Sequence, residues 1–92
     1  MKFRLGQVVV TRGVNNLIVE DNNFAKFVER SFHRYVTCDW GEMCEDDKNL
    51  NDNAIKTGED RIFAAYKNSN YKIYIITEWD QSATTILFPS EY

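Results

Sequence analysis

The sequence has little of what interrupts or cross-links a polypeptide chain. It contains one proline, four glycines and two cysteines. It also lacks linkers, internal repeats and low-complexity tracts. Its 92 residues fall within the size range of one domain. We therefore expect residues 1–92 to form a single domain with a modest core, because so short a chain buries only roughly 60–65% of its unfolded surface.

Long apolar runs are also missing. No stretch approaches the roughly 20 apolar residues that a membrane-spanning helix needs, and residues 1–6 lack the apolar segment of a signal peptide. We therefore expect a cytoplasmic protein without membrane contact. In that compartment Cys38 and Cys44 are expected to be thiols and not a disulfide.

The chain has no excess of positive charge. Eleven basic residues against 14 acidic ones give a net charge of −3. This balance argues against binding a phosphate backbone by bulk charge, so we expect no direct nucleic-acid contact, although a local basic patch is not excluded. The first third of the chain is nevertheless basic and the middle acidic, an asymmetry that could steer a charged partner. The basic residues are Lys2, Arg4, Arg12, Lys26, Arg30 and Arg34.

Hydrophobic spacing predicts the elements of the first half. Residues 7–11 are a β-branched run typical of a strand. Residues 14–19 suit either a short helix or a second extended segment, and we favour one or two helical turns. From about 22 to 36, apolar residues recur every three or four positions, which predicts an amphipathic helix capped by one of residues 21–23. Its apolar positions are Phe24, Phe27, Val28, Phe32 and Tyr35.

A further helix is predicted to start at Asp39. Asp39 and Glu42 have capping-box spacing, in which each side chain accepts from an open amide of the first turn. The acids that follow suit the positive end of the helix dipole. Gly58 lies just past the expected end and is a typical stop signal.

The last third changes to an alternating pattern. Residues 61–67, 71–79 and 83–88 each predict a strand. The links between them, residues 68–70 and 80–82, are short and consist of residues that favour turns. Short links between consecutive strands favour antiparallel hairpins. The sequence therefore predicts an α+β fold: an N-terminal strand, two to three helices, and a three-stranded antiparallel β-meander packed on the helices.

Metal and thiol chemistry have few candidate residues. His33, Cys38 and Cys44 are soft metal ligands, and Asp39 would be a fourth, but their spacing matches no standard zinc site. Cys44 near a helix start would favour a thiolate, whereas its acidic neighbours oppose one. We expect a surface histidine and two small thiols, and we predict no cofactor and no catalytic residue.

Carboxylates are the most concentrated group of candidate functional side chains, in residues 42–47 and at Asp80. No glycine-rich phosphate loop or basic cluster accompanies them, so we expect them to form a face that binds the basic surface of a protein partner. One alternative is a metal-dependent hydrolase or nuclease that uses the same acids with Glu78. Another is a nucleic-acid-associated regulator, which the net charge disfavours. The predicted partner-binding residues are Glu42, Glu45, Asp46, Asp47 and Asp80.

Two segments resemble a known family. Residues 39–48 read DWGEMCEDDK, and residues 76–92 read ITEWDQSATTILFPSEY. Together with residues 6–9 and 64–66, they are similar to small proteins of plasmids, prophages and integrative elements that are often labelled "plasmid-related protein". The resemblance implies a mobile-element setting but no reaction. From it we expect a small accessory protein that acts by protein binding, in its sharpest form as an inhibitor of a host defence system such as CRISPR or restriction.

Overall fold

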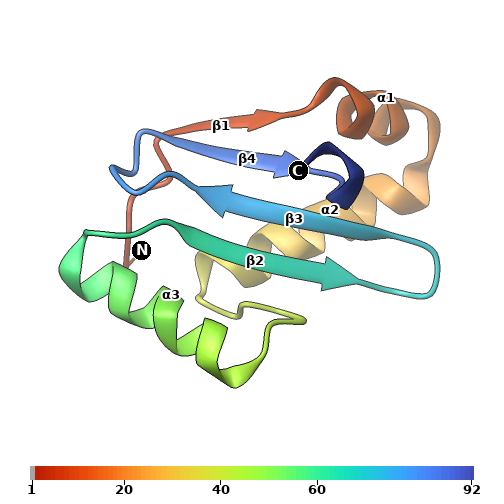
Figure 1. The fold of residues 1–92 in the computed structure, drawn as a ribbon. Helices are drawn as coiled ribbons and strands as arrows, with labels where there is room; N and C mark the ends of the chain where they lie inside the picture. Colours follow the sequence, from red (N-terminus) through yellow and green to blue (C-terminus); the bar gives the residue numbers. More distant parts are fainter. Residues whose placement is uncertain (1) are drawn as a thin grey trace.

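The computed structural model describes residues 2–92, which form one mixed sheet with helices against it (Figure 1). The helices are α1 (Arg12–Glu20), α2 (Asn22–Val36) and α3 (Glu45–Thr57), and the 3₁₀ turn is η1 (Pro89–Glu91). The strands are β1 (Gln7–Val10), β2 (Ile62–Lys67), β3 (Lys72–Thr77) and β4 (Ala83–Leu87). The predicted α+β class and the order of elements are confirmed.

The sheet has the strand order β1-β4-β3-β2. β2, β3 and β4 form the predicted antiparallel meander. The predicted three-stranded sheet is incomplete, because β1 pairs with β4 in parallel, with Val8 opposite Thr84. A parallel pair needs a long connection between its strands, and everything from α1 to β3 supplies it here.

The first two helices follow local signals closely. α2 spans the predicted residues, and the Asp21 carboxylate caps it by accepting from the amides of Asn23 at 3.0 Å and Phe24 at 3.1 Å. α1 is longer than the one or two turns expected, with nine residues. The Thr11 hydroxyl caps α1 by accepting from the Val14 amide.

The predicted start of the third helix is wrong. α3 begins at Glu45 and not at Asp39. The Asp39 carboxylate pairs with the Arg34 guanidinium at 2.8 Å, and its other oxygen accepts from the Gly41 amide at 3.2 Å. Asp39 and Glu42 therefore form no capping box, and residues 39–44 are an extended loop.

The loop 39–44 is extended because it docks on β2. Gly41 forms an isolated bridge with Ala65 of β2, and the Glu42 amide donates to the Ala65 carbonyl at 2.7 Å. A Cβ on Gly41 would lie only 2.1 Å from that carbonyl oxygen, and Gly41 has a φ of 72°. Contact with the sheet thus overrides the local helix signal. Gly58 ends α3 in the left-handed conformation, as predicted.

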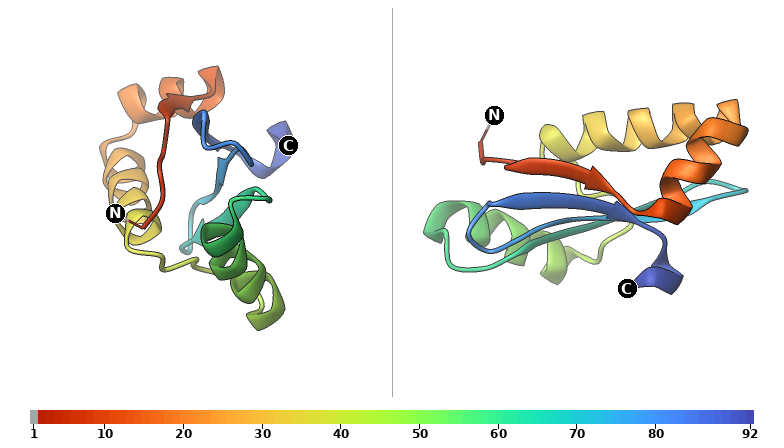
Figure 2. Two further views of the ribbon diagram at one scale, coloured as in Figure 1. Left: turned by 90° about the vertical axis from the view of Figure 1, so that its left-hand side faces the viewer. Right: turned by 90° about the horizontal axis from the view of Figure 1, so that it is seen from above.

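One face of the sheet carries the core. α2 lies across this face, whereas the opposite face carries the C-terminal turn, with α3 along its β2 edge (Figure 2). Buried hydroxyls join the two layers. Tyr35 of α2 bonds to Thr77 at 2.5 Å, Thr77 bonds to Thr84 at 2.8 Å, and Thr84 donates to the Leu5 carbonyl at 2.6 Å. Within residues 2–92, no buried side-chain nitrogen or oxygen atom lacks a hydrogen-bond partner, as burial of a polar group requires.

The outer edge of β2 is covered by α3. The buried Asn51 side chain donates to the Phe63 carbonyl at 2.8 Å and accepts from the Phe63 amide at 3.1 Å. One side chain thus replaces the backbone of a missing neighbouring strand. This contact places the start of α3 beside the sheet face that α2 does not cover.

Candidate functional site

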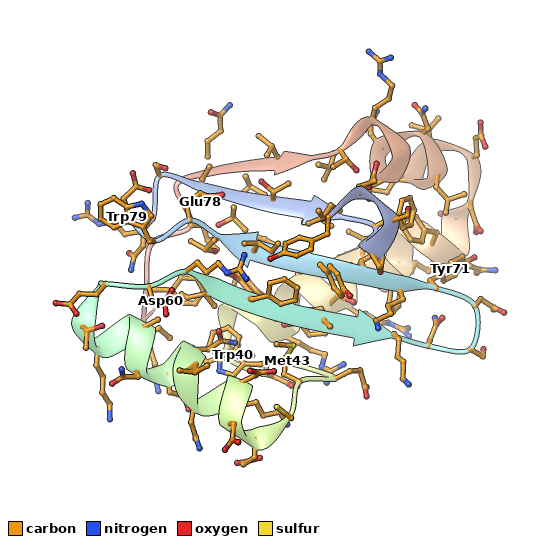
Figure 3. All side chains as sticks on the ribbon, viewed as in Figure 1. Trp40, Met43, Asp60, Tyr71, Glu78 and Trp79 are labelled. Carbon is orange, nitrogen blue, oxygen red and sulfur yellow. The ribbon has the colours of Figure 1, made fainter. Side chains whose placement is uncertain are left out.

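Four of the five predicted partner-binding acids lie together. Glu42 is in the loop 39–44, and Glu45, Asp46 and Asp47 form the first turn of α3. Asp80 lies in the β3–β4 turn next to Trp79, which Figure 3 places at one end of the sheet, away from Met43 at the start of α3. The structure therefore does not bring Asp80 to the other four.

Asp80 has a local structural role in its turn. Its carboxylate accepts from the Ser82 amide at 3.1 Å. Hydrogen bonds from the side chain and amide of Ser82 lower the pKa of Asp80 below its ordinary value. The carboxylate is thus held ionised at the surface, where it stabilises the hairpin.

The candidate metal ligands are dispersed. His33 is exposed on α2, Cys38 is half-buried in the turn after it, and Cys44 is exposed before α3. The Cys44 thiol donates to the Asp47 carboxylate at 3.2 Å, whereas burial raises the pKa of the Cys38 thiol. Across residues 2–92, no three histidine, cysteine or acidic side chains are grouped so that they could hold a metal ion.

The sheet face opposite α2 presents an aromatic cluster that the sequence analysis did not single out. Phe63 of β2, Tyr74 of β3 and Tyr92 after η1 meet with ring centroids 4.8–5.9 Å apart. Tyr92 is 63% exposed, and the other two rings are half-buried. Arg61 joins them, and we call Arg61, Phe63, Tyr74 and Tyr92 the open face.

Arg61 ties the C-terminal residue to the sheet. Its guanidinium lies 5.3 Å from the centre of the Phe63 ring and 5.6 Å from that of Tyr92, and it donates to the Tyr92 hydroxyl at 2.5 Å. The Asp60 carboxylate accepts from the Arg61 backbone amide at 2.8 Å. Stacking and hydrogen bonding together fix the aromatic residues in one arrangement.

Two hollows flank the Arg61–Tyr92 contact. The larger, of about 500 Å³, also contacts Met43, Leu50, Asp47 and Asp60. The smaller, of about 260 Å³, also contacts Ile76, Leu87, Glu78 and Glu91. Each hollow thus has apolar side chains and two carboxylates, and Arg61 is the only cation that lines either of them. Figure 3 labels Met43, Asp60 and Glu78 around this face.

The open face has the composition of a binding surface. Exposed aromatic and apolar side chains bounded by carboxylates complement a surface that is both apolar and basic. Asp47 belongs to this rim and also to the acidic turn of α3, so the predicted acids and the open face are continuous.

Part of this site was visible in the sequence. The alternation in residues 61–67 and 71–79 predicts that Phe63 and Tyr74 lie on the face opposite Ile62, Ile73 and Ile75. What alternation could not give is the helix arrangement that leaves this face uncovered. Nor could it place Tyr92, because that requires the η1 turn and the long-range contact with Arg61.

No family model, curated protein or solved structure matches the chain. Within residues 2–92, no helix has both the length and the apolar character to cross a membrane.

Proposed function

We propose that the protein works by binding a protein partner with a basic surface, through the open face and the acidic start of α3. The observation that carries this proposal is an aromatic sheet face without a covering helix, rimmed by carboxylates. Exposed apolar patches with polar rims mark interaction sites. Tyrosine and arginine, which supply most of the open face, are the residues that most often dominate binding energy.

The acids and the aromatic residues have different tasks in this interface. Glu42, Glu45, Asp46 and Asp47 lie at the edge and attract a basic partner from a distance, an effect that falls with salt. The apolar contact then comes from the open face and from Leu50. Leu50 lies one helical turn after the acids and is 57% exposed. The acidic rim, Glu42 and residues 45–47, therefore sets the association rate. The centre, Leu50 with the open face, sets the lifetime of the complex.

The setting follows from the resemblance of residues 39–48 and 76–92 to small proteins of plasmids, prophages and integrative elements. In such a setting the partner is a cytoplasmic host defence complex of the CRISPR or restriction type. Surfaces that hold nucleic acid are basic. An acidic protein that occupies such a surface excludes the nucleic acid and inhibits the complex.

Capture from host lysate with a matched pair of variants tests this function. Leu50→Asp introduces a charge at the centre of the contact, whereas Val19→Asp introduces the same charge at an apolar residue of α1 that is 77% exposed. A partner retained by the wild type and by Val19→Asp, but lost from Leu50→Asp, supports the proposal. Equal retention by both variants contradicts it.

The rival enzyme function makes a different prediction. A metal-dependent nuclease would hydrolyse nucleic acid in the presence of magnesium or manganese, and Glu45→Gln with Asp46→Gln would abolish the activity. We expect no hydrolysis above that of a blank preparation, because the acids lie along a helix turn without grouped ligands. Hydrolysis that these substitutions remove would replace the binding function with the enzymatic one.

A further inference from the structure

A second surface lies between α2 and the β2–β3 turn. It differs from the open face in charge and in composition. It is a groove of about 580 Å³ with four cations along it: Lys26, Arg30 and Arg34 of α2, and Lys67 of β2. No carboxylate lines the groove. A protein with a net charge of −3 thus concentrates a third of its 11 basic residues at one groove, where they produce a local positive potential.

The cations are spaced regularly. Lys26, Arg30 and Arg34 follow one another at intervals of four residues, so they lie roughly 6 Å apart along one side of α2. Arg34 is engaged by Asp39, and theirs is the only ion pair between side chains within residues 2–92. Lys26, Arg30 and Lys67 are exposed, so these three side chains are available to an anionic ligand.

The floor of the groove is aromatic. The rings of Phe27 and Tyr71 lie 5.7 Å apart, and both side chains are half-buried. The Tyr71 hydroxyl donates to the Asp21 carboxylate, which fixes the ring in place. Figure 3 places Tyr71 at the end of the sheet opposite Trp79. The lining also includes Ser31 and three amide side chains, those of Asn23, Asn68 and Asn70. The Asn68 side-chain oxygen accepts from the amides of Asn70 and Tyr71, which orders the turn.

We propose that this groove binds single-stranded nucleic acid. Successive phosphates lie along Lys26, Arg30 and Lys67, and the bases stack on Phe27 and Tyr71 with asparagine side chains at their edges. Cations along a groove with an aromatic floor are the usual combination in proteins that bind single strands. An acidic peptide would use the cations alone, because it carries no bases to stack on the half-buried rings of Phe27 and Tyr71.

Fluorescence anisotropy with a labelled oligothymidylate of about 12 nucleotides tests the proposal. Three phosphate contacts on a single strand predict a slope of about −2 for the logarithm of affinity against that of salt, so affinity falls roughly 15-fold between about 50 and 200 mM salt. Replacing Lys26, Arg30 and Lys67 by alanine should remove most of this slope. The charge-matched control replaces Arg12, Lys48 and Lys56 by alanine, none of which lines the groove.

The outcomes separate the ligands. Loss of binding in the groove variant alone, with an abasic oligomer of the same length bound several-fold more weakly than the oligothymidylate, supports the proposal. Three results overturn it: no binding of oligothymidylate by the wild type at about 50 mM salt, equal loss in both triple variants, or a labelled oligoglutamate bound as tightly as the oligonucleotide. Unchanged melting curves of both triple variants show that charge, and not folding, has been altered.

Discussion

Trp40 shows how a single residue organises this chain. The ring is 3% exposed and contacts two aromatic neighbours, Phe3 with centroids 6.0 Å apart and Tyr35 at 5.5 Å. Its indole N–H donates to the Asp52 carboxylate at 3.0 Å. Trp40 thereby connects the N-terminal segment, α2 and α3, although it belongs to none of the three. Its place in a loop was not expected, because the sequence predicts a helix from Asp39.

Replacing Trp40 should be severe. Trp40→Ala removes a buried ring from a junction of three segments and is expected to lower the free energy of unfolding by about 3–5 kcal/mol. Trp40→Phe keeps much of the packing and loses the hydrogen bond to Asp52, so it should cost clearly less. Urea denaturation measures both. A change of under about 1 kcal/mol for Trp40→Ala would show that the junction does not depend on this ring.

Two surface carboxylates couple stability to acid pH. A hydrogen bond from Tyr71 lowers the pKa of Asp21, and hydrogen bonds from Arg34 lower the pKa of Asp39. Because the pKa is lower in the folded state, the stabilisation is present above the ordinary value of 3.8 and is lost as the pH falls through the lowered values.

The double variant Asp21→Asn with Asp39→Asn should therefore be less stable than the wild type at pH 7. On acidification below pH 3.8 its stability should fall less than that of the wild type, in which protonation breaks the two interactions. Melting midpoints between neutral pH and pH 3 measure this difference. Parallel pH profiles for the two proteins would show that neither carboxylate interaction contributes.

At the scale of elements, local signals were reliable where nothing distant competed with them. Asp21 caps α2 and Gly58 ends α3, both as the sequence predicts. Asp39 and Glu42 also have the right spacing for a helix start, but Gly41 between them docks on Ala65 of β2. That contact joins residues 24 positions apart. The spacing of Asp39 and Glu42 carries no information about it, so the predicted helix cap, Asp39, lies five residues before the observed cap, Cys44.

The edge of β2 offers a second test at this scale. Asn51→Ala leaves the amide and carbonyl of Phe63 without their partners beside a buried helix face, which should cost about 2–3 kcal/mol of unfolding free energy. Asn53→Ala is the matched control, since Asn53 lies on the same helix and is exposed. Urea denaturation of both variants gives the comparison. Equal, small effects would mean that water satisfies the strand edge without Asn51.

At the scale of the whole molecule, the two charge signs occupy different surfaces. The acids of the α3 start and the open face lie beside β2, and the cations of α2 line the groove at the β2–β3 turn. The sequence already separates a basic first third from an acidic middle, so this segregation was predictable in outline. The arrival of Lys67 beside the α2 cations was not, because it depends on how the hairpin packs against α2.

The sequence could not predict which face of the sheet the helices cover, or that β1 pairs with β4. Alternation in β2 and β3 indicates two apolar faces, but it does not say which of them a helix covers. The parallel pairing of β1 with β4 depends on contacts between residues more than 70 positions apart, such as Val8 and Thr84. The uncovered face and its aromatic cluster are a consequence of the assembled sheet and not of any one segment.

The association rate with the captured partner tests the central claim most directly. Glu45→Lys with Asp46→Lys reverses charge at the acidic rim, and Glu20→Lys with Glu29→Lys makes the same change on exposed residues of α1 and α2. In stopped-flow measurements at low salt, the rim variant should associate about tenfold or more slowly than the wild type, with little remaining salt dependence, while the control retains the wild-type rate and salt dependence. Equal rates for the rim variant and the wild type across the salt range would contradict the proposed role of this surface.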